Sequence, residues 1–104
     1  MSDNELKRLK EVVARACGTT VDKMDARTRL AAPALARQVG MYYVVKSGKT
    51  LEATGEIFKR HYTNVVYAKN KIEDMREVDP WVQNVMREVE QEIPELEEVA
   101  ECNG

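Results

Sequence analysis

The sequence lacks any run of apolar residues long enough to span a lipid bilayer, which takes about 20 residues. Its first residues, MSDNELKRLKEVV, contain no apolar stretch ahead of a small-residue cleavage site. We therefore expect a protein that is made and kept in the cytoplasm and has no membrane partner. One histidine and two cysteines are too few soft ligands for a zinc site, and we expect neither a metal nor a cofactor. Cys17 ends an apolar helix face and Cys102 lies in a polar segment, which argues against a structural disulfide.

Aromatic residues make up only 6% of the chain, which also has three prolines and five glycines. Apolar residues account for 43% and charged residues for 33%. This balance is typical of a globular domain with charged helix faces and excludes a disordered chain. A length of 104 residues gives room for one such domain with a single modest core.

The net charge of −2 hides a strong asymmetry along the chain. Residues 1–76 contain fifteen of the sixteen Lys and Arg residues and nine acidic residues, which gives a formal charge of +6. Residues 77–104 contain one Arg and nine acidic residues, which gives −8. The sequence therefore consists of a basic module followed by an acidic end.

Helix-capping residues recur along the chain, and no segment shows the two-residue alternation of a strand. Ser2 and Glu5 form a capping-box pattern, and Asp79 followed by Pro80 is typical of a helix start. We predict an all-α bundle of about six helices, at roughly residues 3–17, around Val21 and Met24, and at 31–46, 51–58, 62–75 and 80–93. Because Pro94 ends the last helix, we predict a domain over residues 1–94 and an acidic, flexible tail over residues 95–104.

The segment from Thr50 to Met75 has the order of a helix-turn-helix, with a short helix, a tight turn and a longer helix. Helical spacing predicts the buried side of the longer helix to be Val65, Ala68, Ile72 and Met75. Its polar face carries Tyr62, Thr63, Asn64, Tyr67, Asn70 and Lys71. In this motif the first residues of the second helix enter the major groove of DNA.

These polar side chains suit contact with DNA. Asn pairs with adenine, Thr reaches a base edge or a thymine methyl group, and Lys and Tyr hold phosphates. Lys59, Arg60 and His61 add basic side chains at the turn, where the start of a helix also favours phosphate. The alternative interpretation is an ordinary solvated helix face on which Thr63 or Asn64 acts as a cap.

A second basic cluster, Arg27-Thr28-Arg29, lies in the connector before the long helix predicted at residues 31–46. Such a pair of arginines can reach phosphates or enter an adjacent narrow minor groove. Isolated surface arginines are also common, so solvated surface remains the alternative interpretation of this cluster.

Four segments in succession resemble one known family. VVARACGTTVDKM resembles its first helix and short second segment, and ARQVGMY resembles its RQ-x-x-MY helix. TLEATGEIF resembles its SLPEIG-x-x-F segment, and RHYTNVVYAKNKI stands in place of its RDHTTVLHA-x-x-KI signature. Over residues 12–75 the chain thus resembles the C-terminal DNA-binding domain of the bacterial replication initiator DnaA, which is related in fold to the Trp repressor. The resemblance implies binding to double-stranded DNA.

The resemblance also implies roles for individual residues. It places the major-groove readers on His61, Tyr62, Thr63 and Asn64, with Glu52 at another base-proximal position. It places the minor-groove arginine on Arg29 and backbone contacts near Lys46, Lys49, Arg60 and Tyr67. Together with the basic residues named above, the expected minor-groove or backbone set is Arg27, Arg29, Lys46, Lys49, Lys59, Arg60, Tyr67 and Lys71.

The chain departs from the family within the signature itself. The family's Asp-His-Thr-Thr is His-Tyr-Thr-Asn here, so only Thr63 is retained, and one turn glycine is missing. We therefore expect a DNA site different from the initiator's own recognition box. Arg37, Gln38 and Met41 also match the family, and on the long helix we expect them to be structural.

Catalytic motifs are not recognisable in the sequence. Gly48-Lys49-Thr50 imitates the end of a P-loop, but that motif would need a glycine where Tyr43 stands and a strand before it. His61 has no neighbouring candidate nucleophile, and no paired carboxylates stand out. We expect a protein that is not an enzyme and does not bind ATP.

The leading hypothesis is a stand-alone, nucleoid-associated DNA-binding protein that acts in transcription regulation or DNA replication. The alternative is a protein-interaction module of the same fold. In that case the acidic residues 77–104 would cover the basic face, bind a basic partner or mimic DNA. We expect Trp81 and the apolar stripe Val85, Val89 and Ile93 to pack on the core of the domain, and a seam for self-association is the alternative.

Overall fold

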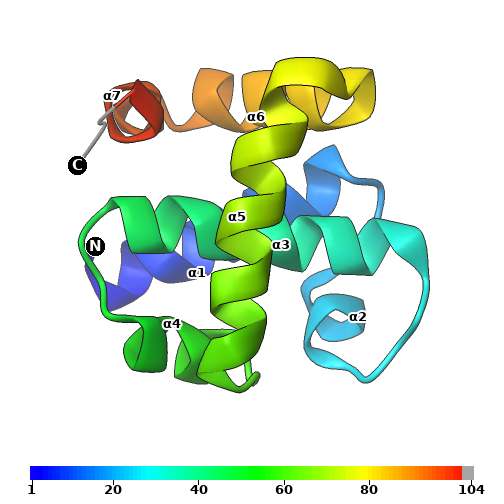
Figure 1. The fold of residues 1–104 in the computed structure, drawn as a ribbon, viewed down its shortest axis with the longest axis vertical. Helices are drawn as coiled ribbons and strands as arrows, with labels where there is room; N and C mark the ends of the chain where they lie inside the picture. The colour runs from blue at the N-terminus through cyan, green and yellow to red at the C-terminus, as the bar shows by residue number, and fades with distance from the viewer. Residues whose placement is uncertain (102–104) are drawn as a thin grey trace.

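The computed structural model describes residues 1–101, and within them it is entirely helical (Figure 1). The helices are α1 (Asp3–Ala16), α2 (Val21–Asp25), α3 (Ala31–Lys46), α4 (Leu51–Ile57), α5 (Tyr62–Val78), α6 (Pro80–Glu92) and α7 (Glu95–Glu101). The predicted all-α class is confirmed. The helices before α7 begin and end close to where the sequence places them.

Capping residues explain several of the helix starts. Ser2 and Glu5 form the expected capping box, with each backbone N–H bonded to the other residue's side chain. Thr50 accepts a hydrogen bond from the third residue of α4. Asp79 caps α6, and Pro80 occupies the first helical position, where its missing N–H costs nothing.

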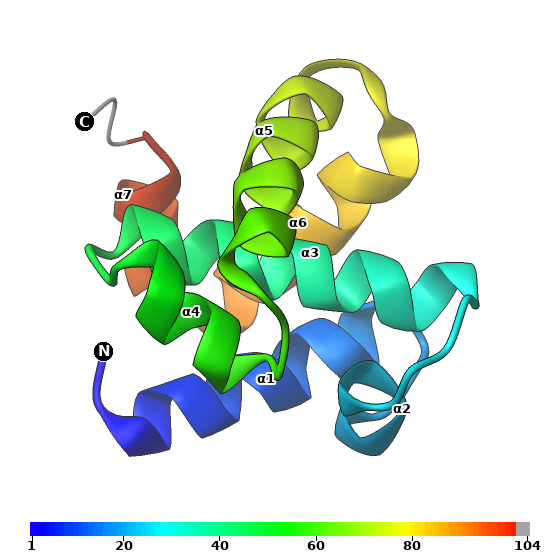
Figure 2. The same ribbon diagram turned by 60° about the horizontal axis from the view of Figure 1, so that its bottom comes forward.

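Helix α3 is the centre of the domain. It lies between α1 and α5 (Figure 2), and it also contacts α2, α4 and α7. Its side chains Met41, Tyr42, Tyr43 and Val44 are all essentially without solvent exposure. A helix buried around its whole circumference forms a core on which the other elements pack. Val45 of this helix and Met75, which was predicted to be buried on the helix after the turn, are only partly buried.

The expected tail folds over much of its length. Residues 95–101 were predicted to be flexible, but they form α7, which packs on α3 and α6. Leu96 is 1% exposed and belongs to the core. Pro94 ends α6 as predicted, yet the apolar Leu96 and Val99 let the chain turn and re-enter the core. Cys102 and the rest of the predicted tail lie outside the described residues.

The acidic end is fastened to the domain by specific bonds. Glu90 accepts a 2.5 Å hydrogen bond from the hydroxyl of Tyr43. Burial, together with this bond, raises the pKa of Tyr43 far above its usual range. Arg15 pairs with Glu92 at 2.9 Å. Trp81 lies at the start of α6 and remains 45% exposed, so it is not the fully packed side chain that a core position would give.

Helix α4 approaches the turn before α5 so closely that only glycine fits at one position. A Cβ built on Gly55 would lie 2.5 Å from the backbone oxygen of Arg60 and 3.4 Å from the backbone nitrogen of Tyr62. Because backbone atoms cannot move aside as a flexible side chain can, Gly55 sets the angle between the two helices.

Replacing Gly55 with Ala should lower the free energy of unfolding by about 1–3 kcal/mol, the usual cost of overpacking. Thermal denaturation followed by circular dichroism measures this loss. The exposed neighbour Glu56 is the control, because Glu56→Ala should change stability by about 0.5 kcal/mol or less. A Gly55→Ala protein as stable as the wild type would show that the helices separate without cost.

Candidate nucleic-acid interface

The first turn of α5 faces solvent. His61, Tyr62, Thr63 and Asn64 are all exposed, while Val65 directly after them is buried. The helix is capped by His61, whose Nδ1 accepts a hydrogen bond from the backbone N–H of Thr63 at 3.3 Å. The cap of α5 is therefore His61 and not Thr63 or Asn64, so that part of the alternative interpretation is wrong.

The turn between α4 and α5 is built from left-handed backbone at a residue other than glycine. Lys59 has φ of 57°, and its N–H donates to the carbonyl of Glu56 at 3.2 Å. The N–H of Arg60 donates to the carbonyl of Gly55 at 2.8 Å. This pair of bonds is a Schellman motif, which normally has glycine where Lys59 stands. The chain therefore places a cation at a position where glycine is sterically favoured.

The connector of residues 26–30 lies beside this turn. Arg27 and Arg29 are exposed, and the hydroxyl of Thr28 accepts a hydrogen bond from the N–H of Leu30 at 3.2 Å. Arg60 reaches across from the turn and donates to the carbonyl of Ala26 at 2.8 Å. Two segments that are 34 residues apart in the sequence are thus joined directly.

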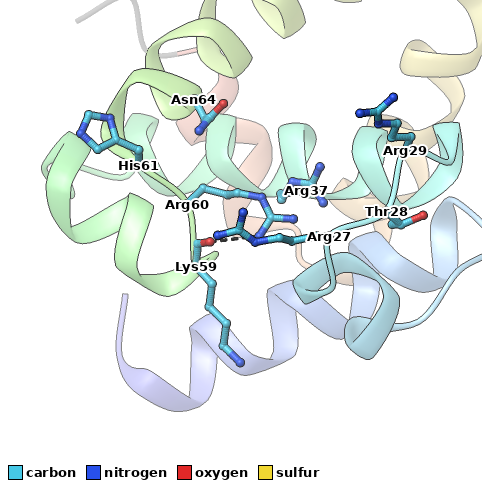
Figure 3. Close-up of a pocket in the computed structure, with 8 residues that line it drawn as sticks. All are labelled: Arg27, Thr28, Arg29, Arg37, Lys59, Arg60, His61 and Asn64. Carbon is cyan, nitrogen blue, oxygen red and sulfur yellow. Dashed lines mark hydrogen bonds between the residues drawn. The ribbon is translucent and has the colours of Figure 1, made fainter.

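A basic hollow of about 430 Å³ lies between the connector and the first turn of α5 (Figure 3). Its lining contains five cationic side chains and no carboxylate, and consists of Arg27, Thr28, Arg29, Arg37, Lys59, Arg60, His61 and Asn64. We call this feature the basic hollow. Burial and the neighbouring charge of Arg60 lower the pKa of Arg37, against the opposing effect of Asp25. An anion entering the hollow would relieve this repulsion between like charges.

Other predicted residues lie at varying distance from this surface. Glu52 is exposed in the first turn of α4, and Lys49 is partly exposed just before that helix. Tyr67 is 61% exposed on α5, with the Nζ atom of Lys71 5.8 Å from its ring centre. Tyr67 and Lys71 extend the polar face of α5 past its first turn.

Lys46 does not belong to this surface as a free cation. Its side chain is only 10% exposed, and its Nζ atom lies 3.2 Å from Oε1 of Glu73. The ammonium also lies 5.7 Å from the ring centre of Tyr42. Lys46 thus forms an ion pair that joins α3 to α5. The structure does not support the predicted contact of Lys46 with phosphate.

Arg37 is a residue of the basic hollow that the sequence did not indicate. It was expected to be structural, and its guanidinium does donate to the carbonyl of Met24 at 2.8 Å. It nevertheless lines the basic hollow together with Thr28. No sequence spacing links α3 with the α4–α5 turn, so this placement could be read only from the fold.

The acidic helices lie away from the basic hollow. In Figure 1, α6 and α7 are at the top, whereas the first turn of α5 is at the bottom beside α4. Contacts agree with this view, because α7 packs on α3 and α6, and α6 packs on α1 and α5. Within residues 77–101, the acidic end therefore does not cover the basic face, and that form of the alternative hypothesis is wrong.

A family model described as the bacterial DnaA protein helix-turn-helix matches residues 6–72, about two thirds of the chain. The match spans the basic hollow and the turn from α4 to α5. Among residues 1–101, no helix is long and apolar enough to cross a membrane. The same residues include no group of three or more His, Cys, Asp or Glu side chains arranged to hold a metal ion.

Replacing Lys59 with Gly should raise the free energy of unfolding by about 0.5–1 kcal/mol. Left-handed backbone costs a non-glycine residue about 1–2 kcal/mol, and the greater freedom of an unfolded glycine offsets part of that gain. The lost ion pair with Asp25 at 3.8 Å matters little, because Lys59 is 67% exposed. The melting temperature should rise by roughly 2–8 °C. Lys59→Ala is the control, since it removes the charge but keeps the strained φ angle, and equal stabilisation by both variants would contradict this account.

Proposed function

The chain belongs to the bacterial DnaA helix-turn-helix family, and from this premise we propose that it binds double-stranded DNA through the first turn of α5 and the basic hollow. The observation that carries the proposal is the exposed turn of residues 61–64 beside five cationic side chains with no lining carboxylate. A helix start flanked by positive charge suits insertion into the major groove between two phosphate backbones.

The side chains divide into two groups by position. His61, Tyr62, Thr63 and Asn64 would meet base edges in the major groove, with Glu52 close to them. Phosphates or the adjacent minor groove would be met by Arg27, Arg29, Lys49, Lys59, Tyr67 and Lys71. The side-chain amide of Asn64 forms no hydrogen bond with the described residues 1–101, which leaves both its donor and its acceptor available to a base.

We propose that the recognised DNA sequence differs from the initiator's box, because His61, Tyr62 and Asn64 replace three of the four reading residues. The protein would act as a stand-alone, non-catalytic factor in transcription regulation or DNA replication, associated with the nucleoid. A single module of this kind buries only about 600–1,000 Å² of protein surface on DNA. Clustered sites or self-association would then supply additional specificity.

A second candidate function is binding of a partner protein through the C-terminal helices. The observation that favours it is the exposure of Val78 and Trp81, at 78% and 45%, where α5 meets α6. The acidic helices α6 and α7 also lie on the side away from the basic hollow. Binding at this surface would leave the proposed DNA site open.

Binding to duplex DNA of random sequence should fall steeply as salt is added, because phosphate contacts release counterions. Four to six phosphate contacts predict a slope of about −4 to −5 in a plot of log K against log salt concentration. Fluorescence anisotropy at several salt concentrations measures the slope. Since Leu96 is buried, Glu97→Gln with Glu98→Gln is a better test of the acidic end than truncation. A protein that fails to bind even at low salt, with or without these changes, would favour the partner-protein function.

Arg29→Ala and Asn64→Ala should each weaken DNA binding by about 1–3 kcal/mol. Both side chains are exposed, so the melting temperature should stay nearly constant. Arg87→Ala and Asn84→Ala are matched controls, because these exposed residues lie on α6 and bond to each other at 2.9 Å. Equal losses in all four variants would mean that binding does not depend on the basic hollow.

A further inference from the structure

We propose that Arg60 is a positioning residue that holds the connector of residues 26–30 against the turn before α5, rather than a phosphate contact. The proposal rests on the proposed function and deepens it. It assigns to one guanidinium the alignment between the arginines of the connector and the reading residues of α5.

The two terminal nitrogens of Arg60 bond to backbone carbonyls of the protein. Its Nη2 atom donates to the carbonyl of Ala26 at 2.8 Å, and its Nη1 atom lies 3.5 Å from the carbonyl of Asp25. Nη1 also donates to the carbonyl of Lys59 at 3.0 Å, within the turn itself. A planar guanidinium with several fixed donors is suited to bridging carbonyls in this way. Both terminal nitrogens of Arg60 are therefore engaged by carbonyls of the domain.

The carbonyls in question belong to the end of α2, a helix of five residues. Arg37 donates to the carbonyl of Met24 at 2.8 Å, so Arg37 and Arg60 together hold three successive carbonyls. The last carbonyls of a helix lack partners within the helix and need donors from elsewhere. Arg37 comes from α3 in the core, whereas Arg60 comes from the turn of the helix-turn-helix, so the guanidinium of Arg60 ties these carbonyls to the reading surface.

The carbonyl of Ala26 links the hydrogen bond from Arg60 to the hydrogen bonds within the connector. It accepts a hydrogen bond from the N–H of Thr28 at 3.1 Å as well as one from Arg60. The hydroxyl of Thr28 in turn accepts from the N–H of Leu30 at 3.2 Å. Arg27 and Arg29 alternate with these bonded residues. Loss of the Arg60 guanidinium would therefore release the segment that carries both arginines.

The carboxylate of Asp25 leaves Arg60 free for this role. It pairs with Lys10 at 2.9 Å, where both side chains are largely buried, and with Lys59 at 3.8 Å. Arg60 thus meets backbone carbonyls rather than the adjacent carboxylate. Arg60 and Arg37 repel each other, and hydrogen bonds to backbone carbonyls hold both guanidinium groups in place against this repulsion.

A double-mutant cycle on DNA affinity tests the proposal. Arg29→Ala should weaken binding on the order of tenfold. Arg60→Ala should weaken it to a similar degree, and adding Arg29→Ala to Arg60→Ala should cost less than about twofold more. The slope of log K against log salt concentration should become less steep in each single variant, and the double variant should show no further change. If the double variant instead loses affinity by the product of the two single losses, and its salt slope falls further than that of either single variant, the proposal is overturned and Arg60 is a separate phosphate contact.

Asn64→Ala combined with Arg29→Ala is the matched control, because Asn64 lines the same hollow without holding the connector. The loss of DNA affinity in this double variant should equal the product of the losses in the two single variants. Arg60→Lys separates charge from geometry, since lysine keeps the cation but has one nitrogen to offer to three carbonyls. A positioning role predicts that Arg60→Lys binds nearly as weakly as Arg60→Ala, whereas wild-type affinity in this variant would contradict it.

Amide hydrogen exchange tests the same inference without DNA. In Arg60→Ala, and in Arg60→Lys if the alanine variant is unstable, the amides of Thr28 and Leu30 should exchange about tenfold faster or more. Amides of α3 should be unchanged, as should all of these amides in Asn64→Ala. Unchanged exchange at Thr28 and Leu30 would overturn the positioning role. Failure of the wild-type protein to bind DNA would instead defeat the proposed function and leave this exchange test standing.

Discussion

The burial of α3 is the constraint on which the rest of the structure depends. Tyr42 and Tyr43 fill the core, and Gly40 lies so close to Phe58 that a Cβ there would be 2.7 Å from the ring. Through this helix α2, α4 and α5 are brought to one side of the domain. The basic hollow exists because α2 and the consecutive helices α4 and α5, which are distant from α2 in the sequence, share α3 as a support.

Local chemistry made much of the fold predictable. Ser2, Thr50 and Asp79 are capping residues whose side chains find backbone N–H partners within one turn, so the sequence alone indicates where those helices begin. Leu96 was missed for the opposite reason. In an acidic segment after a proline, one leucine has no periodicity, and its burial depends on a space between α3 and α6 that only the folded chain defines.

The candidate site was likewise predictable where its residues are neighbours in the sequence, but not where their partners are distant. The residues of the first turn of α5 are adjacent in sequence, and the helix-turn-helix order was enough to group them. Lys46 and Arg60 were both expected to touch phosphate, since their chemistry is that of a cation near the motif. Lys46 instead bonds to Glu73, which is 27 residues away in the sequence. Arg60 bonds to the carbonyl of Ala26, which is 34 residues away. Such partners depend on tertiary packing, which single-sequence patterns do not contain.

The separation of charge gives the domain a direction. Residues 77–104 carry −8 and residues 1–76 carry +6, and the structure places the basic hollow and the helices α6 and α7 at opposite ends of α5. A net charge of −2 would by itself repel DNA, yet the field close to the surface depends on which face approaches. Approach by the acidic end is penalised and approach by the basic hollow is favoured. The acidic helices would thus orient encounters with a polyanion without touching it, and salt would weaken this orientation together with the contacts themselves.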